Sequence, residues 1–344
     1  SEHVMPHGDT LYVNAFTAGA SFLIDLSDPL EPRLAGSFRE MGEFTYPHTF
    51  ERLPDGNVLV TFQTKGGGNE IAGGLVEREP AGRLVRSADA ADPVDPELRA
   101  YSVTPIPSID RAVSTTTDMR MEANGTSFQV WGLSDLTLLK TVPLPPGPSG
   151  HEHRDPAEVR LLPDSATAIL TTFSCSMYLL HGLDTEAPGA ELVYTLPWAT
   201  YDTDECGIPL TRGGYWIQTY AHSTGSALVS LDISDPTRPV EVDRMTLEGD
   251  WWPHWISIEP EGDRIVLTSG QGETLYRVLV IRLDPATGEF SLDPTFRDPG
   301  ADRPGVSFDR ISWPHGTAGP ARPHGAVFSR EHSKSDHLRG EVNP

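Results

Sequence analysis

Residues 46–56 read YPHTFERLPDG, and residues 252–262 read WPHWISIEPEG. In both stretches Pro precedes a His, a second Pro follows six residues after it, and an acidic residue with Gly marks a turn before an apolar, β-branched run. The two histidines, His48 and His254, lie 206 residues apart. A unit that repeats a His at one structural position predicts a closed, symmetric fold that gathers ligands around its axis.

A second pair of matching stretches gives the length of the unit. FLIDLSDP begins at Phe22, and LVSLDISDP contains the same pattern 207 residues later. Four units of about 52 residues fit both spacings, and seven such units fill residues 1 to about 329. The 31 Pro and 32 Gly separate short apolar runs, which is typical of many short strands joined by tight turns.

The sequence therefore predicts an all-β, seven-bladed β-propeller that forms a single domain over residues 1–329. We expect the ring to close between the N-terminal and C-terminal segments, and the inner strand of the first unit to be short or missing. Residues 330–344 are polar and predict a flexible tail.

Composition narrows the possible partners. The 344 residues carry a formal net charge of −23, from 49 acidic and 26 basic residues, which argues against a nucleic-acid or anionic-membrane partner. No apolar run of about 18 residues predicts a membrane span, and no signal peptide opens the sequence. The compartment, cytoplasmic or periplasmic, and the oligomeric state stay open. Two cysteines are too few for a disulfide scaffold; their pairing stays open, and Cys206 is expected to be a buried thiol.

Several motifs spread over most of the chain resemble the selenium-binding protein family, which includes the bacterial methanethiol oxidases. The motifs that carry the resemblance are Pro47-His48-Thr49, Gly73-Gly74-Leu75-Val76, Phe128-Gln129-Val130-Trp131, Pro156-Ala157-Glu158-Val159-Arg160, Asp232 to Pro239, and Gly319-Pro320-Ala321-Arg322-Pro323-His324. The resemblance implies a seven-bladed propeller and, from the oxidase members, copper-dependent oxidation of a small thiol.

Histidines are the candidate metal ligands, because neutral imidazole binds copper, iron, zinc and nickel. His48 and His254 lead, since the repeat places both at the axial start of an inner strand. His324 is implied by the family segment, and His315, which shares the Trp-Pro-His opening of His254, competes with it for one ligand position. His3 supplies a further candidate from the first unit. The alternative for each is a structural histidine held by hydrogen bonds.

Carboxylates and aromatic residues complete the predicted site. Glu205 takes the His-equivalent position in the fifth unit, and Glu158 lies one residue past that position in the fourth unit. Both carboxylates are predicted to orient metal-bound histidines or, alternatively, to form salt bridges. A substrate pocket, or else ordinary packing between blades, is predicted for Trp252, Trp255, Trp313 and His222.

These features favour a metal-dependent oxidoreductase, with copper as the first choice of metal and iron as the second, that acts with O₂ on a small organic substrate. Two other functions stay open. The first is a lyase or hydrolase that uses the ion as a Lewis acid, and the second is a propeller that binds a partner without catalysis.

Overall fold

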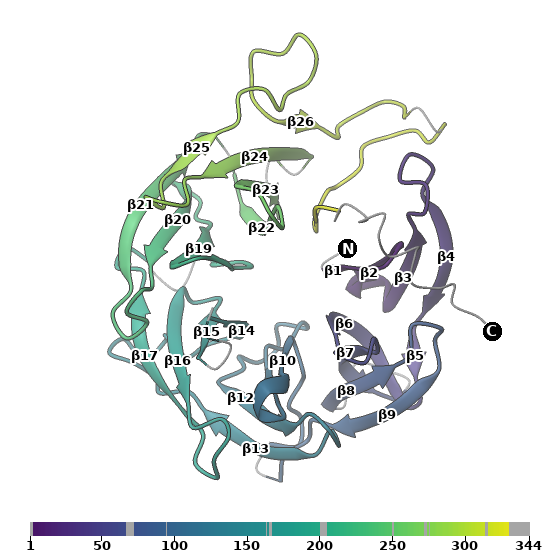
Figure 1. Cartoon of the computed structure of the whole chain (residues 1–344), viewed down its shortest axis with the longest axis vertical. Helices are drawn as coiled ribbons and strands as arrows, with labels where there is room; N and C mark the ends of the chain where they lie inside the picture. Colours follow the sequence, from purple (N-terminus) through teal and green to yellow (C-terminus); the bar gives the residue numbers. More distant parts are fainter. Residues whose placement is uncertain are drawn as a thin grey trace, which may run out of the picture.

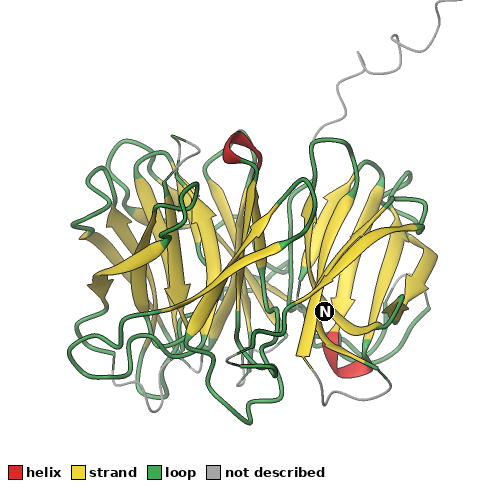
Figure 2. Cartoon of the chain, turned by 90° about the horizontal axis from the view of Figure 1, so that it is seen from below, coloured by secondary structure: helices red, strands yellow, loops and turns green. Residues whose placement is uncertain are grey.

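The described residues form six antiparallel β-sheets arranged as blades in a ring (Figure 1). Seen from the side, the strands stand upright around the axis, and the loops gather on two opposite faces (Figure 2). The computed structural model describes residues 3–66, 72–93, 95–162, 164, 167–199, 205–249, 251–271, 274, 276–313 and 316–329.

Strand order within each sheet follows the order of the chain. The first sheet contains β1 (Val4–His7), β2 (Thr10–Ala15), β3 (Ala20–Asp25) and β4 (Arg33–Phe38). The second contains β5 (Glu40–Met41), β6 (Phe44–Arg52), β7 (Val58–Lys65), β8 (Ala72–Arg78) and β9 (Leu84–Asp89). The third contains β10 (Val103–Ile106), β11 (Arg111–Thr115), β12 (Ser127–Gly132) and β13 (Leu138–Pro143).

The other three sheets repeat this arrangement. The fourth contains β14 (Pro156–Leu161), β15 (Ala168–Thr172), β16 (Ser176–His181) and β17 (Gly189–Thr195). The fifth contains β18 (Leu210–Arg212), β19 (Tyr215–Tyr220), β20 (Ser226–Asp232) and β21 (Val240–Leu247). The sixth contains β22 (Pro253–Ile258), β23 (Arg264–Ser269), β24 (Arg277–Leu283), β25 (Phe290–Leu292) and β26 (Val306–Ser307).

The prediction of seven blades is wrong, because the described residues form six. The unit length of about 52 residues is close to the spacing of the sheets, but the sixth sheet's main strands end at Leu292 and only β26 follows among the described residues. The sequence after β26 explains the difference: residues 311–325 carry three Pro and three Gly, and Pro cannot donate to a strand ladder.

The inner strand of the first sheet was expected to be short or missing. It is present and short: β1 has four residues and pairs with β2 from Val4 opposite Val13 to His7 opposite Thr10. The N-terminal residues therefore complete a four-stranded blade.

The shared Pro-His motif has a structural explanation. The register between the first two long strands shifts at Pro47–Phe50 in the second sheet and at Pro253–Trp255 in the sixth. The inner strand of a blade has a free edge toward the axis, where Pro is tolerated, and a bulge turns the following side chain away from the regular alternation. The fourth sheet shifts at the same place, between Pro156 and Val159. In the second and sixth sheets the residue at this shift is a histidine, His48 or His254, that lines the axial cavity.

Apolar side chains hold neighbouring sheets together. Five clusters fill the spaces between successive sheets from the first to the sixth. Trp131 and Trp216 are both fully buried, the first between the second and third sheets and the second between the fourth and fifth. No blade can bury such a face alone, so the ring is stabilised by contacts between adjacent blades.

The C-terminal segment lies against the sixth sheet and enters the ring between the sixth and first sheets (Figure 1). The Trp255 Nε1–H donates to the Ala326 carbonyl at 2.7 Å, and the Thr268 hydroxyl donates to the His324 carbonyl. The predicted tail, 330–344, lies outside the described residues. Within the described ranges, no helix is long and apolar enough to cross a membrane.

Candidate functional site

A cavity of about 590 Å³ opens at the axis of the ring, and four histidine side chains line it. His3 precedes β1, His48 lies in β6, His254 lies in β22, and His324 belongs to the C-terminal segment. Because the ring has six sheets, the sixth, first and second are consecutive, and the C-terminal segment lies between the sixth and first. The structure therefore brings together four of the five histidines predicted as ligands. The fifth, His315, lies outside the described residues.

The four imidazoles form two close pairs. The ring centroids of His3 and His48 are 4.6 Å apart, and those of His254 and His324 are also 4.6 Å apart. Both pairs meet edge to face. Trp255 packs its ring 5.3 Å from that of His3, so the predicted pocket tryptophan supports a histidine rather than lining the cavity itself.

Hydrogen bonds determine which nitrogen of His48 carries the proton. Its Nδ1 lies 2.8 Å from the carbonyl oxygen of Tyr101, and Thr49 Oγ1 donates to the same carbonyl at 2.9 Å. A carbonyl can only accept, so Nδ1 is protonated and the lone pair of the neutral ring lies on Nε2. This is the tautomer that can offer Nε2 to a ligand.

Glu205 orients His254 in the same way. His254 Nδ1–H donates to Glu205 Oε1 at 2.7 Å, and Trp252 Nε1–H donates to Oε2 at 2.8 Å. Burial works to raise the pKa of the Glu205 carboxyl, but the hydrogen bonds from His254 and Trp252 outweigh it, and the pKa is lowered. Glu205 is therefore ionised at neutral pH and holds the imidazole of His254 through Nδ1.

Glu158 stands beside His3. Its Oε1 lies 3.8 Å from His3 Nε2, and its Oε2 accepts a hydrogen bond from Arg160 Nη1 at 2.6 Å. Glu158 thus forms the salt bridge that was the alternative prediction for it, and its role toward a metal-bound histidine stays a prediction.

Burial keeps three of the imidazoles uncharged. Desolvation lowers the pKa of His3 to about 3, with Arg160 and His254 adding to the effect. Desolvation also lowers the pKa of His48 to about 3 and that of His324 to about 2. Nδ1 of His324 is buried and has no hydrogen-bond partner among the described residues. His3, His48 and His324 therefore present neutral imidazoles to the cavity, which is the form that binds metal ions.

Two residues predicted for the substrate pocket lie elsewhere. Trp313 packs its ring against Phe308 and donates to the Gly319 carbonyl, away from the cavity. His222 stacks on Tyr220 and hydrogen-bonds Thr224 through Nδ1. Of the predicted pocket residues, Trp252 lines the cavity directly.

Sequence reasoning missed much of the cavity wall. Tyr101 and Asp155 line it, and they follow His48 at 53 and 107 residues, close to one and two repeat units. The period itself was thus a signal that could have identified both residues. Phe173 and the loop Thr117–Asn124 also contribute, but no motif or repeat position distinguishes them.

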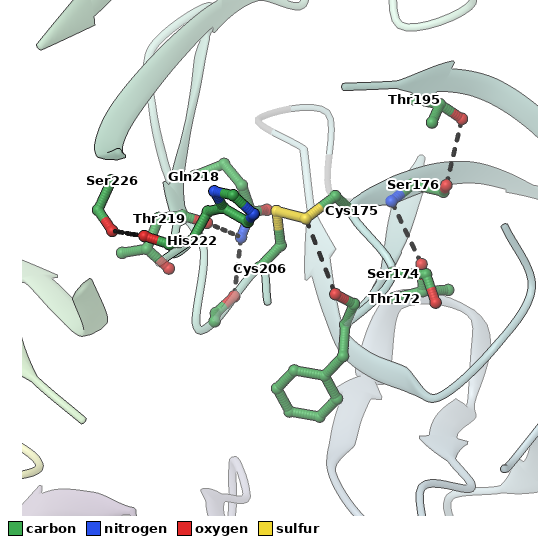
Figure 3. The surroundings of a disulfide bond; sticks show 12 residues. Thr172, Ser174, Cys175, Ser176, Thr195, Cys206, Gln218, Thr219, His222 and Ser226 are labelled. Carbon is green, nitrogen blue, oxygen red and sulfur yellow. Dashed lines mark hydrogen bonds between the residues drawn. A yellow bond between two sulfur atoms is a disulfide. The ribbon is translucent and has the colours of Figure 1, made fainter. Parts of the chain in front are cut away.

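A disulfide joins two loops at the wall, the turn between β15 and β16 and the segment before β18. Cys175 and Cys206 are bonded (Figure 3). Their neighbours in the chain, Ser174 and Glu205, line the cavity. The backbone N–H of Cys206 also donates to the Phe173 carbonyl at 3.1 Å. The expectation that Cys206 is a buried thiol is therefore wrong. Sequence could not pair the two cysteines because they are 31 residues apart and belong to different blades.

The histidines do not form a ready-made metal site: no group of three or more His, Cys, Asp or Glu side chains within the described ranges is arranged to hold an ion. Binding by three of the imidazoles would require their rings to turn about the side-chain bonds.

Comparison with known proteins supports the fold. Neither a protein-family model nor a curated protein matches the chain. Among solved structures it is similar to a hypothetical selenium-binding protein from Sulfolobus tokodaii, with a TM-score of 0.67, 15% identity, and coverage of 84% of this chain and 75% of that one. A periplasmic gluconolactonase from Pseudomonas aeruginosa gives a TM-score of 0.63, 15% identity, and coverage of 84% and 82%. The dihydro-haem d1 dehydrogenase NirN gives a TM-score of 0.54 and 16% identity, with coverage of 87% of this chain and 56% of that one. At such low identity these similarities show a β-propeller and nothing more.

Proposed function

We propose that this protein is a metal-dependent oxidoreductase that acts with O₂ on a small organic substrate in the axial cavity. The observation that carries the proposal is the meeting of four imidazoles, from three blades and the C-terminal segment, at one cavity. A bound copper or iron ion would supply electron transfer between the substrate and O₂. Oxidation of a small thiol is the version suggested by the resemblance to the selenium-binding protein family.

The chemistry of the donors fits such an ion. His48 and His254 each direct Nδ1–H to a fixed acceptor, the Tyr101 carbonyl and the Glu205 carboxylate, so that Nε2 is the nitrogen left for coordination. His324 contributes a buried nitrogen that has no hydrogen-bond partner within the described part of the chain. Histidine ligands in metalloproteins are held in this way by outer carboxylates and carbonyls.

The residues of the chain have defined tasks in this proposal. His3, His48, His254 and His324 bind the ion, and Glu205 and Glu158 act as positioning residues for His254 and His3. Tyr101, Phe173 and Trp252 exclude water from the site and contact the substrate.

Metal content and affinity test the proposal. Untagged protein is analysed for metals and then titrated with Cu(II) or Fe(II) by calorimetry, and O₂ uptake is followed with small thiols. We expect one equivalent of metal, its loss in the His48→Ala plus His254→Ala variant, and unchanged binding in the control His181→Ala, whose side chain is exposed on β16. Glu205→Gln should weaken binding by about 10- to 100-fold, because His254 loses its charged acceptor.

Two results would overturn or redirect the proposal. Full copper occupancy in the double variant would place the metal elsewhere, for example at a free amino terminus with His3. Stoichiometric metal without O₂ uptake for any substrate would instead favour Lewis-acid chemistry at the same ion.

A further inference from the structure

The wall of the cavity that faces the histidines is formed by carboxylate, aromatic and Met side chains. The third and fourth blades build it from the loop Thr117–Asn124, from Asp155 before β14, and from Phe173. The metal-binding proposal gives no task to Asp155 or to this loop.

The Asp, Glu, Lys and Arg side chains that line the cavity are all acidic. Three carboxylates, Asp118, Asp155 and Glu205, line it, and no Lys or Arg is found among the described residues that do. The chain as a whole has a formal net charge of −23, so the surrounding potential also attracts cations and repels anions.

Two of the three carboxylates already have partners. Glu205 accepts hydrogen bonds from His254 and Trp252. Asp118 forms ion pairs with Arg120 at 3.0 Å and with Arg99 at 3.5 Å. Neither is therefore available as the principal contact for a ligand.

Asp155 differs from both. Its Oδ1 accepts one hydrogen bond, from the Gly125 N–H at 3.1 Å, and it has no ion pair within the described ranges. Burial raises the pKa of its carboxyl to about 6; the nearby charge of Asp118 also raises it, whereas the Gly125 N–H and Arg154 lower it. Near neutral pH the group is still mostly ionised, so the cavity holds a negative charge that forms no ion pair within the described ranges.

The backbone keeps this carboxylate in place. Asp155 has φ of +53°, a left-handed conformation that is uncommon for a residue other than Gly. Its N–H donates to the Gly125 carbonyl at 2.8 Å, and its carbonyl accepts from Phe173 N–H at 2.9 Å. The side chain is thus anchored from two sides, next to an aromatic residue of the same wall.

Besides Asp118 and the polar residues Thr117, Asn124 and Ser174, this wall carries apolar and aromatic side chains. Tyr101 and Phe173 contact each other with ring centroids 5.6 Å apart, and Met119 and Met121 come from the loop. Aromatic faces attract both apolar rings and cations, and Met adapts to varied shapes. An apolar pocket with one well-placed charge selects ligands that combine a ring with the opposite charge.

We propose that the cavity binds a small aromatic amine, with its ring against Tyr101 and Phe173 and its ammonium group on Asp155. Carboxylate and phosphate ligands are excluded by the same charges. This inference rests on the proposed oxidoreductase and names aromatic amines, in place of small thiols, as the substrate class of its cavity; it concerns binding alone.

Three ligands with the same ring test the proposal on metal-free protein. Tyramine is cationic at pH 7.5, tyrosol is neutral, and 4-hydroxyphenylacetate is anionic. Calorimetry should give the tightest binding for tyramine, about 10- to 100-fold tighter than tyrosol, as expected for a charge-assisted hydrogen bond. Binding of 4-hydroxyphenylacetate should be the weakest.

Asp155→Asn is the decisive variant. Asn has nearly the same shape and tolerates the left-handed region, so the fold should be kept. The variant should lose the preference for tyramine over tyrosol and keep its affinity for tyrosol. Asp28→Asn, an exposed change in another blade, removes the same charge and should leave the preference intact.

The results separate this inference from the function proposed above. Equal affinities for the three ligands, or a preference for tyramine that persists in Asp155→Asn, would overturn the aromatic-amine proposal. Neither outcome would affect metal binding by the histidines, because the ligands are tested without metal. Conversely, tyramine binding as expected together with the absence of metal binding would refute only the proposal of a metal-dependent oxidoreductase.

Discussion

Replacing His48 by Gln should make the stability of the metal-free protein less sensitive to acid. Burial lowers the pKa of His48 to about 3, whereas an unfolded histidine has a pKa of about 6.5. Between these values the unfolded chain binds a proton that the folded protein does not, so the free energy of unfolding falls as pH is lowered through 6.5.

The size of the effect follows from the shift. Each pH unit between 6.5 and 3 costs about 1.4 kcal/mol for each such histidine, so His48 alone removes roughly 2 kcal/mol at pH 5. His3 and His324 behave in the same way, because their pKa values are lowered to about 3 and about 2. The three together give roughly 6 kcal/mol, which is comparable with the whole stability of many domains.

Two carboxylates oppose this loss. Burial raises the pKa of Glu51 to about 7 and that of Asp155 to about 6, so in the folded state both bind protons more readily than in the unfolded chain. Acidification from pH 7 to pH 5 therefore regains about 2 kcal/mol at Glu51 and about 1 kcal/mol at Asp155. The contribution of the histidines is the larger one, so the free energy of unfolding of the native protein still falls on acidification, by only a few kcal/mol.

Comparing native protein with His48→Gln cancels the contributions of the carboxylates and of the other histidines, because both proteins contain them. Urea unfolding in EDTA at pH 7.5, 6 and 5 gives the stability of native protein, His48→Gln and the exposed control His181→Gln. The difference between native protein and His48→Gln should change by about 2 kcal/mol from pH 6.5 to pH 5. Parallel pH profiles for the two proteins would show that His48 is not buried in the neutral form, and the reasoning about neutral imidazoles would fail.

Two further predictions concern the scaffold. Replacing Cys175 and Cys206 by Ser should lower stability by about 3–4 kcal/mol, because the bond closes a loop with a sequence separation of 31, and a reductant should have the same effect on the native protein alone in a thermal melt. Gly73→Ala should lower the free energy of unfolding by about 3 kcal/mol or more, because the added Cβ would lie 1.8 Å from the Phe62 carbonyl oxygen. The control Gly225→Ala has open space around the added Cβ and should leave stability nearly unchanged. Equal unfolding midpoints for the two variants would contradict the close packing of β7 and β8.

Much of each blade could be predicted from sequence. Pro47-His48 and Pro253-His254 are local signals, because a Pro at the axial edge and the bulge after it depend on a few neighbouring residues. The same repeat spacing reaches Tyr101 and Asp155, which sequence reasoning did not use. Local pattern therefore gave the fold class and the two leading histidines.

The partners of those histidines could not be predicted in the same way. Glu205 was expected to stand near a histidine, but its pairing with His254 and Trp252 depends on how the fifth and sixth blades pack. The disulfide joins two blades and the loop of residues 117–124 carries no repeat motif, so the repeat could not place them.

The sequence by itself determined the strands, the length of the repeat and the position of His48 and His254 within it, because these follow from residue types a few positions apart. Only the tertiary structure decided that the ring has six blades, so that the sixth, first and second are consecutive and His3 and His324 join the same cavity. Closure of the ring depends on the angle at which each sheet packs on the next. That angle is the result of many buried contacts between blades, and no stretch of sequence contains it.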